Sequence, residues 1–202
     1  MTDTVETTAP AGLVARARGI LLNPTTEWRT IRVEATTVAR LFTGYACILM
    51  AIPAVATSIQ LMLFGHAGLT AVILVALLSY VLSLLGVLVQ GGLFNALAPS
   101  FGGQRDFVQA MKLAVYPQTA ACVAGVLNVF PLTGILVVAA GIYGLYILWV
   151  GLPKLMKVPP DKAVGYIIVN ALLAFVVNVA LAMVIVVISR AVVLGIATPV
   201  SG

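Results

Sequence analysis

Residues 164–189 read VGYIIVNALLAFVVNVALAMVIVVIS and contain no charged side chain. An α-helix rises about 1.5 Å per residue, so roughly 20 apolar residues cross the hydrocarbon core of a bilayer. This block is therefore long enough to span a membrane. Four more blocks are also long enough, at about residues 41–64, 69–98, 113–130 and 132–152. The sequence predicts an all-α integral membrane protein, built as a bundle of five transmembrane helices.

The composition agrees with a membrane protein. Hydrophobic residues make up 62% of the 202 residues, and charged residues make up 8%, whereas soluble domains are about 45–50% apolar. We expect a cytoplasmic leader at 1–40, a five-span domain at 41–190 and a short external tail at 191–202. Residues 1–12 are polar and acidic, so no cleavable signal peptide is expected.

The basic residues indicate how the chain is oriented. The turns near His66 and Asn128 contain no Lys or Arg, and only Arg190 follows the last span. The remaining basic residues precede the first span or follow the second and fourth, namely Arg16, Arg18, Arg29, Arg32, Arg40, Arg105, Lys112, Lys154, Lys157 and Lys162. Because Lys and Arg concentrate in cytoplasmic segments, we expect a cytoplasmic N-terminus and an external C-terminus in the plasma membrane, the inner membrane of a bacterium.

The charges also limit the classes of function. The net charge of +5 is explained by orientation and by contact with anionic lipid, so no nucleic-acid partner is expected. No charged residue lies inside a predicted span, which argues against a proton-coupled transporter. His66 has no carboxylate or thiol near it in the sequence, and Cys47 and Cys122 are interpreted as packing residues. The sequence predicts no metal, no cofactor and no enzymatic activity.

Uncharged polar residues within the spans recur at helical spacing. Asn170, Ala174, Asn178 and Ala182 lie four residues apart, so they share one face of a helix. Such stripes let helices approach closely and form hydrogen bonds across the interface. The alternative is a polar cavity lined by amide side chains. Its candidate residues are Gln90, Asn95, Gln118, Asn128, Asn170 and Asn178.

The leader predicts two short helices. Leu13, Ile20 and other apolar residues recur at helical spacing, which indicates an amphipathic segment at the membrane interface. Pro24 ends this segment, and Trp28 in the next one is suited to the lipid headgroup layer. Two placements remain open, because the leader can lie on lipid or pack beneath the bundle.

Two cytoplasmic loops contain prolines and paired glycines that shape the backbone. Gly102-Gly103 has no lysine at nucleotide-binding spacing, so no phosphate loop is predicted. The candidates for binding lipid headgroups or a partner are Lys154, Lys157, Lys162, Arg105 and Trp28.

Two features of the spans are left open. Gly91-Gly92 can break the second span, and the turn at 128–132 can be a hairpin or part of a re-entrant loop.

Several segments resemble bacterial members of the YIP family, the Ypt/Rab-interacting-protein-like membrane proteins. They are LNPTTEW at 22–28, GY at 44–45, IPA at 52–54, NALAPSFGGQ at 95–104, FVQAMKLAVY at 107–116, GIYGLY at 141–146, GLP at 151–153 and MKVPPDKAVGY at 156–166. The resemblance implies five spans and a cytoplasmic N-terminus. Eukaryotic members bind Rab-type GTPases through a long N-terminal region. The leader is short here and the Asp-Leu-Tyr-Gly-Pro motif is absent, so Rab binding is not expected.

We expect a non-enzymatic membrane protein that acts as an adaptor in membrane organisation or a trafficking-like process, through its cytoplasmic loops and lipid contacts. The alternative is a passive small-solute transporter or permease component with Asn and Gln along its path. The expected partners are membrane lipids, including anionic headgroups, and a membrane or cytoplasmic protein. A second copy of the chain, giving a homo-oligomer, is also left open.

Overall fold

The structure is a computed structural model that describes residues 12–65 and 68–197. Within these ranges the chain contains no strand and is almost entirely helical. It forms five helical runs long and apolar enough to cross a membrane, at Val38–Phe64, Leu69–Phe101, Phe107–Val129, Pro131–Met156 and Pro160–Ile188. The expected five-span helical membrane protein is therefore confirmed. His66, residues 1–11 and residues 198–202 lie outside the described residues.

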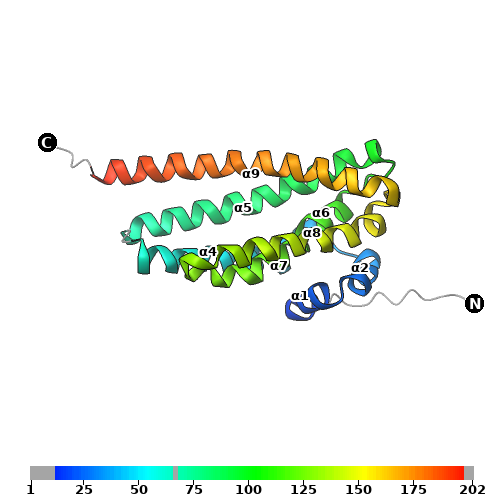
Figure 1. Cartoon of the computed structure of the whole chain (residues 1–202), viewed down its shortest axis with the longest axis horizontal. Helices are drawn as coiled ribbons and strands as arrows, with labels where there is room; N and C mark the ends of the chain where they lie inside the picture. The colour runs from blue at the N-terminus through cyan, green and yellow to red at the C-terminus, as the bar shows by residue number, and fades with distance from the viewer. Residues whose placement is uncertain (1–11, 66–67, 198–202) are drawn as a thin grey trace, which may run out of the picture.

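The first two spans form an antiparallel pair (Figure 1). The first span comprises α3 (Val38–Leu41), a π-helical turn η1 (Phe42–Ala46) and α4 (Cys47–Phe64). The second comprises α5 (Leu69–Leu97) and a 3-10 turn η2 (Ala98–Phe101). Helix α5 continues through Gly91-Gly92 and crosses the bundle obliquely, so the break considered there does not occur. An added Cβ at Gly91 would lie 2.1 Å from Met111 Sδ, so this glycine lets the third span pack close to α5.

The third span lies at the centre of the bundle. It comprises α6 (Phe107–Val115), α7 (Gln118–Ala124) and a 3-10 segment η3 (Gly125–Val129). In its most apolar 18-residue window 67% of residues are buried, against 0% for the fifth span. This burial explains why its apolar block is the least distinct, because its side chains contact protein rather than lipid. The span begins at Phe107, earlier than the expected residue 113. Asp106 caps α6 there, because its side chain accepts a 3.0 Å hydrogen bond from Gln109 N.

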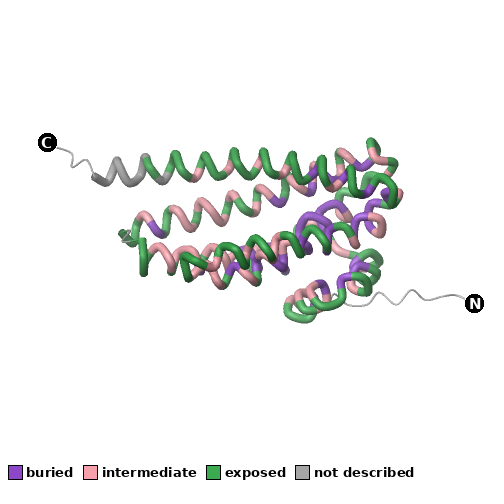
Figure 2. Tube along the Cα trace, in the orientation of Figure 1, coloured by how far each residue is buried: buried purple, intermediate pink, exposed green. Residues whose placement is uncertain are grey.

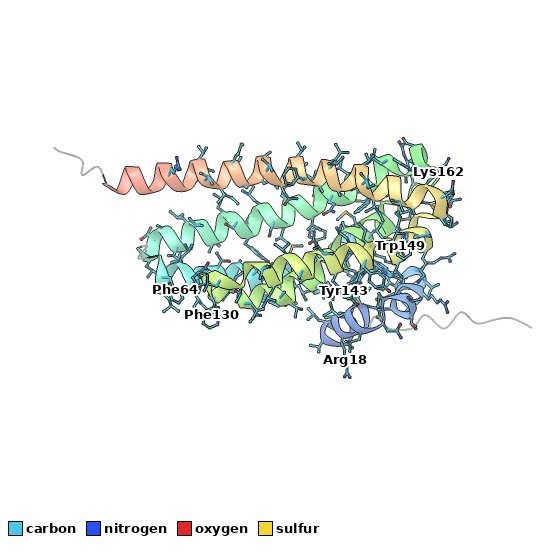
Figure 3. All side chains as sticks on the ribbon, in the orientation of Figure 1. Arg18, Phe64, Phe130, Tyr143, Trp149 and Lys162 are labelled. Atoms are coloured by element: carbon cyan, nitrogen blue, oxygen red, sulfur yellow. The ribbon has the colours of Figure 1, made fainter. Side chains whose placement is uncertain are left out.

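The last two spans follow a short 3-10 turn, η4 (Pro131–Thr133), and are α8 (Gly134–Met156) and α9 (Pro160–Ala197). Phe130 lies at the same end of the bundle as Phe64 (Figure 3), so the chain crosses fully before it turns. The turn at 128–132 is a hairpin between two spans rather than part of a re-entrant loop. Helix α9 packs along α5 at one edge, and most of its residues are exposed (Figure 2).

The leader forms α1 (Leu13–Leu22) and α2 (Pro24–Val33), with Pro24 at the first helical position of α2. Both helices pack beneath the bundle at the end where α5 and α8 finish (Figure 1), as in the second of the two placements left open. We call this the basic end, because every Lys and Arg of the described chain except Arg190 lies in the leader, between η2 and the end of α6, or around the α8–α9 connection. The end with Phe64 and Phe130 is the opposite end.

Candidate functional site: the leader dock and the paired loops

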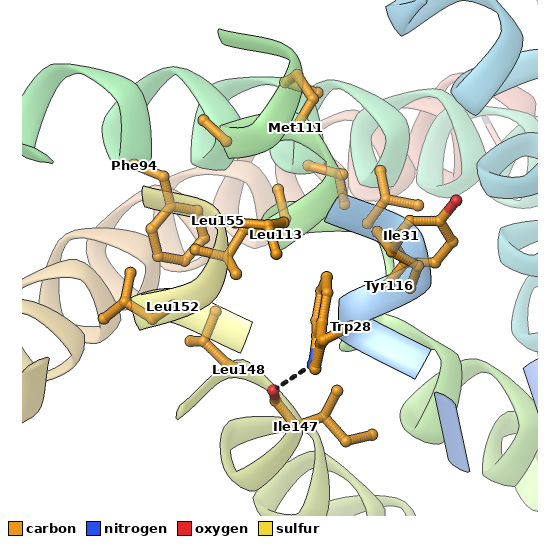
Figure 4. Packing of buried hydrophobic residues seen from close by; sticks show 14 of the residues in the cluster. Trp28, Ile31, Phe94, Met111, Leu113, Tyr116, Ile147, Leu148, Leu152 and Leu155 are labelled. Carbon is orange, nitrogen blue, oxygen red and sulfur yellow. Dashed lines mark hydrogen bonds between the residues drawn. The ribbon is translucent and has the colours of Figure 1, made fainter. Parts of the chain in front are cut away.

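Trp28 anchors the leader in the bundle (Figure 4). Its side chain is 0% exposed, and its Nε1 donates a 2.9 Å hydrogen bond to the carbonyl of Ile147 in α8. An added Cβ at Gly151 would lie 2.5 Å from the indole, so this glycine makes room for the ring. Trp28 was expected in the headgroup layer. The structure instead places it in the interior, where its ring packs edge-on against Tyr116 at a centroid distance of 5.9 Å.

Lys112 holds the end of α2. Its side chain is 1% exposed, and its Nζ donates hydrogen bonds of 2.7 Å to Ile31 O and 2.8 Å to Glu34 O. The last carbonyls of a helix lack partners within the helix and carry partial negative charge, so a buried ammonium is stabilised there. In the sequence, Lys112 was interpreted only as one of the basic residues that set the orientation of the chain in the membrane. Its place between Met111 and Leu113 in an apolar helix was the signal for burial.

Other bundle side chains bind the main chain of the leader in the same way. Lys154 Nζ donates to Thr25 O at 2.7 Å, and Tyr143 Oη donates to Leu21 O at 2.6 Å. Gln109 Nε2 donates to Arg32 O at 3.1 Å. Lys154 was expected to bind lipid or a partner, and the structure shows its ammonium in this internal contact.

Arg16 ties α1 to α2 and to the segment that follows α2. It is 2% exposed and forms ion pairs with Glu27 and Glu34. Its guanidinium also lies 5.9 Å from the centre of the Tyr116 ring, within the range of a cation–π contact. A buried cation must be paired to be tolerated, and the two carboxylates supply that pairing.

The loops that follow the second and fourth spans pack against each other and form one surface. We call residues 102–106 and 157–162 the paired loops. Gln104 N donates a 2.8 Å hydrogen bond to Met156 O, and an added Cβ at Gly103 would lie 2.7 Å from a Val158 methyl group. Gly102 has a φ of +75°, a left-handed conformation that glycine adopts without a steric penalty. The contact of these loops was not predictable from either one alone.

Three basic side chains on the paired loops remain free. Arg105, Lys157 and Lys162 are exposed, and none makes a side-chain hydrogen bond or ion pair with the described residues. Lys162 lies at the tip of the basic end (Figure 3). Lys157 has a φ of 54°, which among the described residues is the only positive φ outside glycine. This conformation costs about 1–2 kcal/mol for a residue with a Cβ.

The six amide candidates differ in burial and in hydrogen bonding. Gln118 Nε2 donates to Gln90 Oε1 at 3.4 Å, the only hydrogen bond between two of the six in the described chain. Asn178 is exposed and donates to Ala174 O within its own helix at 2.7 Å. Asn170 is buried, and neither polar atom of its side chain has a partner within the described residues; the same holds for Asn95 Oδ1. Asn128 lies half-buried in η3.

A family model described as the Yip1 domain matches residues 18–182. The chain belongs to the Yip1 family. The matched region takes in α2, the paired loops and the five spans as far as Ala182, so most of the docking contacts fall within the Yip1 domain. No curated protein and no solved structure matched the chain.

Among residues 12–65 and 68–197, no three His, Cys, Asp or Glu side chains are grouped so as to hold a metal ion. Cys47 and Cys122 are both free thiols, with Cys122 buried. The arrangement provides a basic surface at one end of a membrane-spanning bundle, where Arg105, Lys157 and Lys162 are exposed.

Proposed function

We propose that this Yip1-family protein is a non-catalytic membrane adaptor whose paired loops hold anionic lipid headgroups or an acidic partner at the cytoplasmic face. The observation that carries the proposal is the division among the cations at the basic end. Arg16, Lys112 and Lys154 are engaged within the protein, whereas Arg105, Lys157 and Lys162 are exposed without partners.

The backbone at Lys157 supports the same proposal. Glycine is the usual residue for the left-handed conformation at the end of a helix, and α8 ends with a lysine in that conformation. Strained residues persist where the surroundings fix them, and they cluster at functional sites. A lysine near an anionic membrane surface contributes about 1 kcal/mol to binding, which is comparable to the conformational cost.

We place the basic end at the cytoplasmic face of the plasma membrane, because Lys and Arg concentrate in cytoplasmic segments. The leader extends this surface laterally. Val14 and Leu22 of α1 are 76% and 73% exposed, and Arg18 is exposed on the same helix. Exposed apolar and basic side chains together favour contact with the headgroup region.

The test is the double substitution Lys157→Gly and Lys162→Gln, which removes two charges without adding strain. Lys157→Gly should itself raise the unfolding free energy by about 1 kcal/mol, because glycine tolerates the left-handed conformation. Loss of binding in this variant therefore cannot come from unfolding. The matched control is Arg190→Gln, which removes an exposed charge at the far end of α9.

The measurement is crosslinking in cells, followed by mass spectrometry of captured proteins and of anionic lipid retained on purification. We expect the double variant to lose a partner or a class of anionic lipid that the wild type and Arg190→Gln both retain. An unchanged set of partners and lipids in the stable double variant contradicts the proposal.

A solute path lined by amides has weaker support. The open cavities near Tyr116, of about 380 Å³, and near Pro53, of about 260 Å³, are lined by other residues. Passive solute transport is the alternative function if neither a protein partner nor a bound lipid is found. It would then require solute flux in reconstituted vesicles that falls on Asn170→Leu.

A further inference from the structure

An open cavity of about 380 Å³ lies between the leader and the start of the first span. Its wall includes Arg16 of α1, Glu34 of the α2–α3 connection, Arg40 and Gly44 of the first span, and Tyr116 of the third. The cavity is separate from the paired loops. It lies at the boundary between the cytoplasmic leader and the apolar first span, which is the depth of lipid headgroups.

Three polar groups on this wall have no partner within the described chain. Tyr116 is 5% exposed and its hydroxyl makes no hydrogen bond; Figure 4 shows that hydroxyl directed away from Trp28. The side chain of Glu34 is 10% exposed and pairs with Arg16 through Oε2, which leaves Oε1 free. The exposed guanidinium of Arg40 is also free. Ligand pockets place a few convergent polar groups around a cavity, so this open, polar cluster indicates a ligand.

The charges on the wall indicate what kind of ligand fits. Arg16 is compensated by Glu27 and Glu34, so Arg40 is the uncompensated cation of the cavity. Guanidinium and hydroxyl donors suit a phosphate group. The free oxygen of Glu34 suits an ammonium group instead, and the Tyr45 and Tyr116 rings, 5.0 Å apart, add aromatic faces near it. A purely anionic headgroup would meet the Glu34 carboxylate, whereas a zwitterion has a partner for each of its charges.

We infer that this cavity binds the headgroup of an amine-bearing phospholipid of the phosphatidylethanolamine class. The phosphodiester accepts hydrogen bonds from Arg40 and Tyr116, and the ammonium donates to Glu34. The acyl chains leave through the open side of the cavity along the first span. A lipid bound there would contact the leader and two spans at once.

The test is native mass spectrometry of the full chain, purified in detergent and incubated with equal amounts of phosphatidylethanolamine, phosphatidylglycerol and phosphatidylcholine. We expect one phosphatidylethanolamine to be retained in preference to the other two lipids. Arg40→Gln should lower its retention about tenfold, because it removes a charge-assisted hydrogen bond. Tyr116→Phe removes an unpartnered hydroxyl, so it should leave the fold intact and lower retention about fivefold.

A filled cavity provides a second test that leaves every polar group in place. An added Cβ at Gly44 meets nothing within 4 Å, so Gly44→Met can extend into the cavity without a backbone clash. It should lower retention at least as much as Arg40→Gln. The matched controls are Gly141→Met, at a glycine that is equally open, and Arg18→Gln, at an exposed arginine of the same end outside the cavity wall.

Three outcomes would overturn the inference. Equal retention of phosphatidylglycerol would remove the role of Glu34 as the partner of a cation, and equal retention of phosphatidylcholine would remove the hydrogen bond from an amine to Glu34. An equal loss in Arg18→Gln and Arg40→Gln would reduce the effect to general electrostatic attraction. Binding of soluble glycerophosphoethanolamine as tight as that of the lipid would assign the cavity to a free metabolite. Unchanged retention in the Lys157→Gly, Lys162→Gln variant would support a site distinct from the paired loops, whereas a loss there as large as in Arg40→Gln would overturn that distinction.

Discussion

The two tryptophans of the chain have opposite surroundings. Trp28 is 0% exposed and Trp149 is 51% exposed. Trp28 also donates a hydrogen bond to a carbonyl of α8, whereas Trp149 faces outward near the basic end, where an aromatic ring is suited to the membrane interface. The same residue type is therefore used in two different ways, for internal packing at position 28 and on the outer surface at position 149.

This contrast gives a prediction at the scale of single residues. Trp28→Ala should weaken leader docking by about 3 kcal/mol, because it removes a fully buried aromatic side chain. In detergent, limited proteolysis should then cut between α1 and the first span much faster than in the wild type. Trp149→Ala, which removes the same atoms from an exposed site, should leave the cleavage rate unchanged. Equal cleavage of both variants would mean that Trp28 does not hold the leader.

The sequence shows that Trp28 has both an apolar ring and a polar N–H group. It does not show which residue accepts the hydrogen bond from that N–H group. The residues around it are charged, which is typical of a headgroup position, and its acceptor Ile147 is 119 residues away. Lys112 presents the same difficulty, because its acceptors Ile31 and Glu34 belong to the leader. A single sequence does not indicate contacts between segments so far apart, so the dock emerged only from the structure.

At the scale of elements, glycines set how closely the helices approach. Gly144 of α8 faces the break between α6 and α7, and an added Cβ there would lie 2.8 Å from the carbonyl oxygen of Pro117. Gly141 lies one turn earlier in the same helix, and an added Cβ there meets nothing within 4 Å. The two positions differ in packing and share the same helical backbone.

This pair gives a prediction for the element. Gly144→Ala should destabilise the bundle by about 1–3 kcal/mol, because the carbonyl of Pro117 belongs to the main chain and has little room to shift. Gly141→Ala should be neutral or should stabilise it by up to about 1 kcal/mol through helix propensity. Thermal unfolding in detergent measures both. A melting temperature that falls equally in the two variants would contradict close packing at Gly144.

The apolar blocks predicted the elements well where a span faces lipid. Helices α4, α5, α8 and α9 follow long uncharged runs, since lipid-facing side chains must be apolar. The third span was predicted less well because α6 is buried in protein, where Lys112 can be stabilised by carbonyls. Gly91-Gly92 was also ambiguous, because a glycine pair can break a helix or let another helix pack closely against it. The side chain of Met111 packs against Gly91, so close packing is the role of this glycine.

At the scale of the whole molecule, the two ends of the bundle differ in charge. The leader and the paired loops cover the basic end, while Phe64, Phe130 and Leu132 are exposed at the other. Helix α8, with 23 residues, is about 35 Å long, which is enough to cross the roughly 30 Å hydrocarbon core of a bilayer. An odd number of spans places the start and the end of the described chain on opposite sides (Figure 1).

This asymmetry predicts the topology. In a background with Cys47→Ala and Cys122→Ala, we expect a membrane-impermeant thiol reagent to label Leu132→Cys on intact cells. Lys162→Cys should be labelled only after the membrane is permeabilised, because we propose that the basic end faces the cytoplasm. Leu132 is 94% exposed, so its reactivity is limited by membrane side and not by packing. The reverse labelling pattern would invert the proposed orientation and place the paired loops outside the cell.

Besides the buried Trp28 side chain, main-chain carbonyls bind the leader to the bundle. Its carbonyls at Leu21, Thr25, Ile31, Arg32 and Glu34 accept hydrogen bonds from side chains of the bundle. A carbonyl is the same whichever residue carries it, so these attachments do not depend on the outward side chains of α1 and α2. Arg18, Thr26 and Arg29 are exposed there. The outer surface of the leader is thus a place where a fluorophore or a short epitope can be displayed at the membrane edge while the anchoring beneath it is kept.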